Sequence, residues 1–109
     1  MISSDIMRGY NEVLILSILR EKDNYGYMIS KEIARKCNNE YVIKEATLYA
    51  VLLRLEKRKL VHSYKGEVTC GKERTYFNIT DEGFLYLKEK CDEWSITKKV
   101  LDSILLGRW

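Results

Sequence analysis

The residues with the clearest chemistry are lysines and arginines that gather in one third of the chain. Residues 44–74 hold eight of them against four glutamates, a local charge of +4, whereas the whole 109-residue chain carries only +3. A localised positive charge attracts phosphates and is typical of proteins that bind nucleic acid. A charge run that only keeps a surface solvated is the competing interpretation. The basic residues are Lys44, Arg54, Lys57, Arg58, Lys59, Lys65, Lys72 and Arg74.

Catalytic and metal-binding chemistry is not indicated. Cys37, Cys70 and Cys91 are widely spaced and form no CxxC pair, and His62 is the single histidine. Such a set predicts neither a zinc site nor a disulfide framework. No glycine-rich phosphate loop and no nucleophile motif is present. We therefore expect a protein that is not an enzyme and that holds no metal or cofactor.

Helical periodicity dominates the first part of the chain. Residues 5–21 are predicted to form one helix whose centre, 13–19, is apolar nearly all round. Such a helix is buried on two sides, and we expect the domain core on one side and a partner on the other. A turn at 22–26 and a second helix over 27–36 follow.

A third helix is predicted from residue 44 or 45 to residue 58. Leu48, Val51, Leu52 and Leu55 form its buried stripe, and the opposite side presents Thr47, Ala50 and Arg54 with Tyr49 on the flank. A helix whose exposed face is small near its start and basic further on can lie close against DNA.

After this helix the period of the pattern changes from 3.6 to 2. Residues 60–64 and 75–79 are predicted as strands, linked by 65–74 with Gly66 and Gly71 as turn points. Three helices followed by a hairpin with a basic tip indicate a winged helix-turn-helix, an α+β fold that is mainly α.

A last helix is predicted from the N-cap Thr80 to about Leu106, roughly 40 Å long. Apolar residues recur along it in a heptad-like seam that needs another helix against it. Because one small domain cannot cover it, we expect a homodimer formed through the first and last helices. The expected interface residues are Leu14, Ile18, Trp94, Leu101, Ile104 and Leu105.

The expected division is a DNA-binding domain over 1–79 and a dimerisation helix over 80–109. No apolar run approaches the roughly 20 residues that cross a bilayer, and residues 1–5 lack the pattern of a signal peptide. We therefore expect a cytoplasmic protein without a membrane partner.

The motifs resemble those of the PadR family of transcriptional regulators over nearly the whole chain. Tyr25-Gly26-Tyr27 is similar to the family's start of the second helix, and Glu45-Ala46-Thr47-Leu48-Tyr49 with Leu52, Arg54, Leu55 and Glu56 resembles its recognition helix. The segment 74–83 resembles its wing strand and the start of its last helix. The single long last helix carrying Trp94 resembles a short-tailed subgroup that includes multidrug-sensing repressors. Two departures are Lys59, where many members have glycine, and Glu73, which interrupts the basic wing.

The resemblance and the positions together imply a set of DNA contacts. Lys44, Thr47, Ala50 and Arg54 would approach the major groove, Tyr49 would bind phosphate, and the wing contacts would be Lys65, Lys72 and Arg74. Three alternatives remain open: Tyr49 packing against the second helix, Arg54 paired with Glu45 or Glu56, and Arg74 entering a minor groove. A dimer implies a pseudo-palindromic operator in double-stranded DNA.

The resemblance to multidrug-sensing members also implies an effector site. Paired Trp94 rings would stack a planar aromatic ligand, and Lys98 would suit an anionic one. The other lining residues would be Val13, Leu87 and Cys91. In the alternative interpretation Trp94 only fills the dimer core.

The function predicted from the sequence is a sequence-specific, homodimeric repressor released by a small aromatic ligand. Two alternatives are a winged-helix module that binds protein, and a DNA-binding regulator without any small-molecule effector. A salt-dependent mobility shift with DNA separates the first alternative from the prediction.

Overall fold

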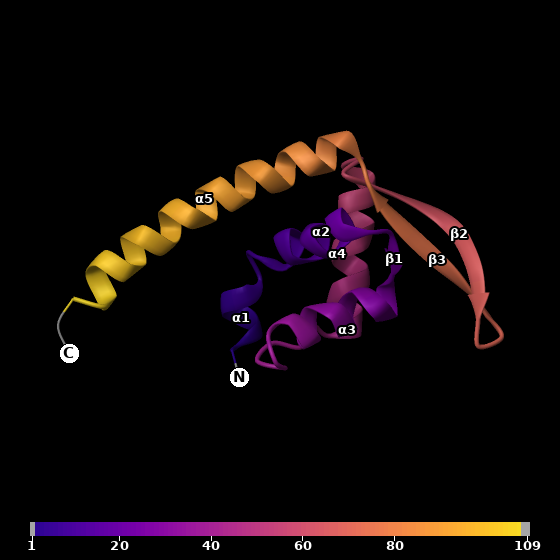
Figure 1. Ribbon diagram of the computed structural model, residues 1–109, viewed down its shortest axis with the longest axis horizontal. Helices are drawn as coiled ribbons and strands as arrows, with labels where there is room; N and C mark the ends of the chain where they lie inside the picture. The colour runs from indigo at the N-terminus through magenta and orange to yellow at the C-terminus, as the bar shows by residue number, and fades with distance from the viewer. Residues whose placement is uncertain (1, 108–109) are drawn as a thin grey trace.

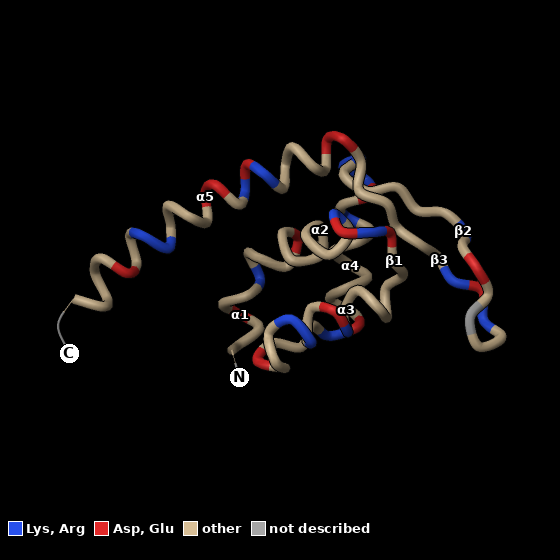
Figure 2. The backbone as a smooth tube through the Cα atoms, in the orientation of Figure 1, with Lys and Arg blue, Asp and Glu red and all other residues tan. Residues whose placement is uncertain are grey.

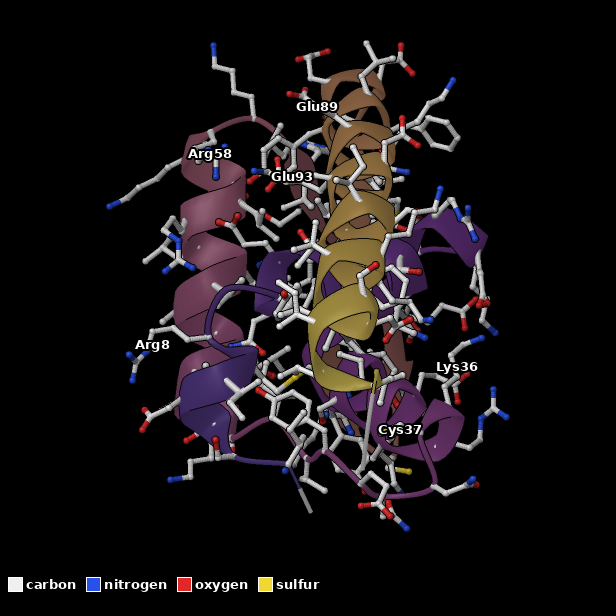
Figure 3. All side chains as sticks on the ribbon, turned by 90° about the vertical axis from the view of Figure 1, so that its left-hand side faces the viewer. Arg8, Lys36, Cys37, Arg58, Glu89 and Glu93 are labelled. Atoms are coloured by element: carbon white, nitrogen blue, oxygen red, sulfur yellow. The ribbon has the colours of Figure 1, made fainter. Side chains whose placement is uncertain are left out.

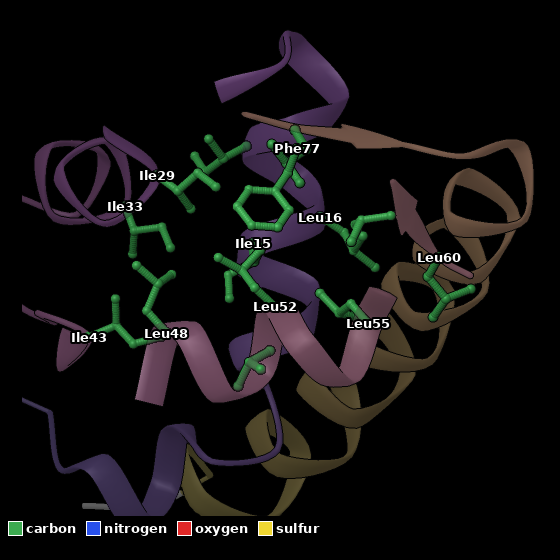
Figure 4. Packing of buried hydrophobic residues seen from close by; sticks show 14 of the residues in the cluster. Ile15, Leu16, Ile29, Ile33, Ile43, Leu48, Leu52, Leu55, Leu60 and Phe77 are labelled. Carbon is green, nitrogen blue, oxygen red and sulfur yellow. The ribbon is translucent and has the colours of Figure 1, made fainter. Parts of the chain in front are cut away.

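Helix α2 (Asn11–Glu21) is the centre of the structure, a computed structural model that describes residues 2–107. Its Ile15, Leu16 and Leu19 are almost fully buried. They pack against α3 (Gly26–Lys36) and α4 (Glu45–Lys57), as the close view of the core shows (Figure 4). The predicted buried stripe of the third helix is confirmed, since all four of its residues lie in this core: Leu48, Val51, Leu52 and Leu55.

The prediction of one continuous helix over 5–21 is wrong. A short helix α1 (Ser4–Met7) comes first, capped by Ser3, and residues 8–10 then break the helix before α2 begins. Gly9 lies in the break, and glycine is a weak helix former. Directly after it, Asn11 is buried and its side-chain oxygen accepts a 2.6 Å hydrogen bond from the Tyr41 hydroxyl. This bond ties the first residue of α2 to the segment between α3 and α4.

The apolar side chains around α2 are covered largely by other helices of the same chain. Helices α3 and α4 lie against it, and so does the start of α5 (Asp81–Leu105). Ile18 is 6% exposed, whereas Val13 and Leu14 are half-buried. The expectation that one whole side of this helix needs a partner therefore overestimates the surface that α2 leaves open.

Three antiparallel strands form a sheet in the order β1-β3-β2. The strands are β1 (Asn24–Tyr25), β2 (Val61–Thr69) and β3 (Lys72–Ile79). Strand β1 lies within the segment predicted as a turn, and it pairs Asn24 with Phe77 and Tyr25 with Tyr76. Two residues are too short to show a period of 2, so the sequence pattern gave no sign of this strand.

The wing is longer than the predicted strands. The hairpin turns only at Cys70 and Gly71, whose φ angles of 53° and 78° suit a two-residue turn. The prediction of Gly66 as a turn point is wrong, because Gly66 lies inside β2. A Cβ atom at Gly66 would clash with the ring of Tyr76, so the glycine serves a close approach of the two strands.

Lys59, between α4 and the wing, also connects α4 to the last helix. Lys59, which stands where many family members have glycine, has a left-handed φ of 61°. A lysine in this conformation costs about 1 kcal/mol relative to glycine. The Lys59 carbonyl accepts a 2.8 Å hydrogen bond from the Thr80 hydroxyl, which also accepts one from the Gly83 N–H. The prediction of Thr80 as the N-cap of the last helix is confirmed.

Helix α5 projects from this body and gives the chain its 55 Å length (Figure 1). Gly83 and Leu87 are its only buried residues. The predicted fold class, mainly helical α+β with a winged helix-turn-helix and a long last helix, is confirmed. Within residues 2–107 no helix is long and apolar enough to span a bilayer.

Candidate nucleic-acid interface

The exposed face of α4 has small and apolar residues at its centre. Ala46, Ala50, Leu53 and Lys57 follow one another at spacings of four, three and four, opposite the buried stripe. Leu53 is 54% exposed. The sequence prediction included only Ala50 of these four, although the same helical spacing contained the signal. A face of this kind allows close approach to a groove edge and apolar contact with thymine methyl groups.

Tyr49 packs against the second helix, as one of the two alternatives held, while much of its side chain stays exposed. Its side chain is 46% exposed, yet its ring crosses the start of α3 next to Gly26. A Cβ atom at Gly26 would lie 2.5 Å from the Tyr49 hydroxyl oxygen, so only glycine admits the ring at this place. The contact with α3 fixes the position of the ring, and the hydroxyl is a hydrogen-bond donor.

Arg54 has a different partner from either of those considered. Its Nε donates to Glu12 of α2 at 3.3 Å, and Arg58 donates to the same carboxylate at 3.2 Å. The Tyr86 hydroxyl of α5 is a third donor, at 2.9 Å. The pairing of Arg54 with Glu45 or Glu56 is therefore wrong: the side chain is 53% exposed and its Nε is directed to Glu12.

The charge on Glu12 is stabilised by this environment. Burial raises the pKa of the carboxyl, but the hydrogen bonds from Tyr86 and Arg54, together with the charges of Arg58 and Arg54, outweigh it. The pKa of Glu12 consequently lies below its ordinary value. The carboxylate stays ionised where it meets the two arginines.

Aromatic rings stiffen the base of the wing. Tyr76 of β3 lies between Tyr25 and Tyr64, with ring centroids 5.4 and 5.9 Å away. The Tyr64 hydroxyl also donates to Asp23, a bond that raises the pKa of Tyr64 to about 12. Asn78 donates to the same carboxylate at 2.9 Å. The wing is thus tied to the segment before β1 and not only to its own turn.

A groove of about 460 Å³ runs between the starts of α3 and α4 and strand β3. It brings together three of the predicted DNA-binding residues, Tyr49, Lys72 and Arg74. The guanidinium of Arg74 lies 4.8 Å from the centroid of the Tyr25 ring, and its buried Nε has no hydrogen-bond partner in the described part of the chain. The remaining lining residues are Tyr27, Ser30, Ile43, Glu45 and Leu48.

Two lining residues of this groove, Tyr27 and Ser30, are absent from the sequence prediction. Tyr27 is 53% exposed at the start of α3, and its place in the Tyr-Gly-Tyr motif was the available signal. Two tyrosine hydroxyls and two cationic side chains are donors for phosphate oxygens, whereas the Ser30 hydroxyl already donates to the Tyr27 carbonyl at 2.9 Å. The groove can therefore hold a stretch of nucleic-acid backbone beside the exposed face of α4.

The other predicted DNA-binding residues lie outside this groove. Lys44 and Thr47 line a separate hollow with Ser4 and Arg8, on the side of α1. Lys65 forms an ion pair with Glu73 across the wing, at 3.3 Å. Figure 2 shows this alternation of positive and negative residues along the hairpin. Glu73, which interrupts the basic wing, is thus paired with Lys65. Lys72 and Arg74 are the wing cations that line the groove.

The predicted effector residues do not form one surface within a single chain. Cys91, Trp94 and Lys98 are exposed on α5, and Lys98 pairs with Asp102 at 2.9 Å. Leu87 is 3% exposed in the chain's own core, and Val13 packs half-buried against that core. Within residues 2–107, no group of histidine, cysteine and acidic residues is placed to hold a metal ion.

Known proteins are similar to this chain over nearly its full length. The sequence profile of the transcriptional regulator PadR-like family matches residues 15–89. A transcriptional regulator from Clostridium thermocellum is 52% identical with a TM-score of 0.88, covering 96% of this chain and 99% of that one. A PadR family transcription regulator from Clostridium difficile is 42% identical with a TM-score of 0.77, covering 89% and 99%. An uncharacterised protein from Lysinibacillus sphaericus is 47% identical over 107 residues, 98% of each chain. The chain therefore belongs to the PadR-like family of transcriptional regulators, which bind DNA and are not enzymes.

Proposed function

We propose that the protein is a homodimeric repressor that binds a pseudo-palindromic operator and is released by a planar aromatic ligand. The observation that carries the DNA-binding part is the groove that holds Tyr49, Lys72 and Arg74 next to the exposed face of α4. In this arrangement the face of α4 enters the major groove and the side chains of the groove bind the adjacent backbone. Arg54 takes no part in base contacts, because Glu12 holds it.

The support for a dimer is the exposed apolar surface of the outer half of α5. Seven large apolar side chains there are each about half or more exposed, and surface of this extent on one helix is typical of an interface. Leu101 and Leu105 lie on the same predicted seam as Trp94. These side chains are Trp94, Ile96, Val100, Leu101, Ile104, Leu105 and Leu106. Packing of two such helices would place the two DNA-binding faces symmetrically, as a palindromic site requires.

The support for an aromatic effector is the position of Trp94. The side chain is 48% exposed on the same seam, so a dimer would bring it near its symmetry mate. Two indole rings can stack a flat ligand between them. An anionic ligand would have to compete with Asp102 for Lys98, which favours a neutral aromatic compound.

The test of DNA binding starts from fragments of the source genome. Fragments retained by the protein are sequenced, and binding to the enriched motif is measured at several salt concentrations. The proposal predicts an inverted repeat and a steep loss of affinity with salt. Retention without an enriched motif would contradict sequence-specific binding, and the absence of any salt-dependent shift would favour a protein-binding module.

Repression and release are tested with that motif placed over a reporter promoter. The proposal predicts lower reporter expression with the protein than without it. Flat aromatic compounds are titrated calorimetrically against the parent protein and Trp94→Ala. Equal binding by both proteins would contradict stacking on Trp94. If no compound in the set binds the parent protein or releases it from the operator, the regulator without an effector is the better account.

A further inference from the structure

One carboxylate joins three helices of the fold. Glu12 of α2 accepts hydrogen bonds from Arg54 of α4, from Arg58 directly after that helix, and from the Tyr86 hydroxyl of α5. The guanidinium of Arg58 also lies 4.7 Å from the centroid of the Tyr86 ring. Figure 3 shows Arg58 on the end of α4 that lies beside the root of α5. We call these four residues the Glu12 joint.

The joint is well placed to define an angle between two helices. The Glu12 side chain is only 18% exposed, so its contacts are less screened than those of the surface ion pairs. Helix α4 carries the DNA-facing surface, and α5 carries the apolar seam. The other attachments of the α5 root are Leu87 in the core, Thr80 at its cap, and buried Gly83, which lies against the Leu60 carbonyl. Tyr86 adds an attachment to α2 and to Arg58, which opposes rotation of the helix about the others.

A small change at the joint becomes a large displacement at the far end of α5. Nineteen residues separate Tyr86 from Leu105, which is about 28 Å of helix. Beyond Leu87 no residue of this helix is buried in its own chain. A rotation of about 10° at Tyr86 would move Leu105 by about 5 Å over that length. One base-pair step is about 3.4 Å, so this displacement exceeds one step along DNA.

We propose that Glu12 is a positioning residue that sets the distance between the two DNA-binding faces of the dimer, and therefore the operator spacing that the protein accepts. The inference rests on the proposed homodimer formed through α5. Glu12 itself touches no DNA. It acts through Arg54 and Arg58 on one side and through Tyr86 on the other.

The test is a competition among duplexes that carry the selected half-site twice, in inverted orientation, with spacers of different lengths. Glu12→Gln removes the charge from the joint. Tyr86→Phe removes only the hydroxyl with which α5 reaches Glu12 and keeps the ring, so it serves also if Glu12→Gln folds poorly. Glu21→Gln is the matched control, because it makes the same charge change on the same helix and breaks only an exposed pair with Lys36.

The readout is the ratio of affinities for the preferred spacer and for a spacer one base pair longer. We expect this ratio to fall about tenfold in Glu12→Gln and Tyr86→Phe, and to stay at the parent value in Glu21→Gln. A purely structural role would lower the melting temperature and weaken all spacers alike, leaving the ratio unchanged. Unchanged ratios in both joint variants would overturn this inference alone. A parent protein without any preferred spacer would overturn the proposed dimeric reading of DNA together with it.

Discussion

The guanidinium carbon of Arg74 lies 4.8 Å from the centroid of the Tyr25 ring. Tyr25 belongs to β1, the short strand that joins the helical body to the wing. The arginine of the wing is therefore held by a residue that directly precedes α3. This contact places the charge of Arg74 in the groove between α4 and the wing. The orientation of Arg74 therefore depends on Tyr25, whose ring is not one of the residues that line the groove.

Replacement of Tyr25 should weaken DNA binding through Arg74. A cation–π contact contributes about 0.5–1 kcal/mol at exposed sites and about 2 kcal/mol when desolvated; for this half-buried contact, Tyr25→Leu should lower affinity by a few-fold at low salt. Tyr25→Phe keeps the ring and is the control that should retain affinity. Fluorescence anisotropy with a labelled operator checks both variants. In an Arg74→Ala background, Tyr25→Leu should have little further effect on affinity, and a full additional loss there would contradict the coupling.

The close approach of Tyr49 to Gly26 predicts a strong and specific effect of one methyl group. Gly26→Ala would place a Cβ atom 2.5 Å from the Tyr49 hydroxyl oxygen, and the shift that relieves this should cost about 1–3 kcal/mol of unfolding free energy. Gly9→Ala is the matched control, since a Cβ atom there meets no atom within 4 Å. Urea denaturation gives both values. In a Tyr49→Ala background the cost of Gly26→Ala should largely disappear, and its persistence would show that the clash is not with this ring.

The Glu12 carboxyl predicts a defined dependence of stability on pH. Its pKa in the folded chain lies below the ordinary value, so the unfolded chain binds the proton more readily. The stabilisation is complete above the unfolded pKa of about 4.3 and is lost as pH falls through the folded pKa. Glu12→Gln should lower the unfolding free energy by about 1–3 kcal/mol at neutral pH.

This difference between Glu12→Gln and the parent should shrink in acid. Denaturation curves measured between neutral pH and the acid limit follow it. A difference that stays constant over that range would mean that the charge of Glu12 contributes nothing to stability.

The exposed apolar seam on the outer half of α5 predicts a dimer that a single charged substitution can disrupt. Leu101→Glu would put a charge into the apolar seam, and a buried unpaired charge costs several kcal/mol. The variant should elute as a monomer in size-exclusion chromatography with light scattering. Ser95→Glu introduces the same charge on the polar side of α5 and should leave the dimer intact. A parent protein that is monomeric, or a Leu101→Glu variant that remains dimeric, would contradict this interface.

The sequence predicted the elements with long, regular patterns and missed those fixed by single contacts. The stripe on α4, the Thr80 cap and the PadR family assignment are all confirmed. The break between α1 and α2 depends on Gly9 and on the hydrogen bond between Tyr41 and Asn11, two residues 30 positions apart. No local pattern encodes such a bond.

The candidate site shows the same limit. Proximity in the sequence suggested Glu45 or Glu56 as partners of Arg54, whereas the structure pairs it with Glu12, 42 residues away. The groove residues Tyr49, Lys72 and Arg74 were predicted individually as DNA contacts, and their meeting with Tyr27 and Ser30 follows from the pairing of β1 with β3. Their contact with DNA remains a prediction.

The most direct test of this account is the salt dependence of operator binding by the double variant Lys72→Ala and Arg74→Ala. Each phosphate contact contributes about 0.9 to the slope of log affinity against log salt concentration. The account predicts that the slope becomes shallower by about 2, with weaker binding to every DNA sequence. Lys88→Ala with Lys99→Ala removes two exposed charges on α5, outside the groove, and should keep the parent slope. A slope unchanged by the loss of Lys72 and Arg74 would remove the wing and its groove from the DNA interface.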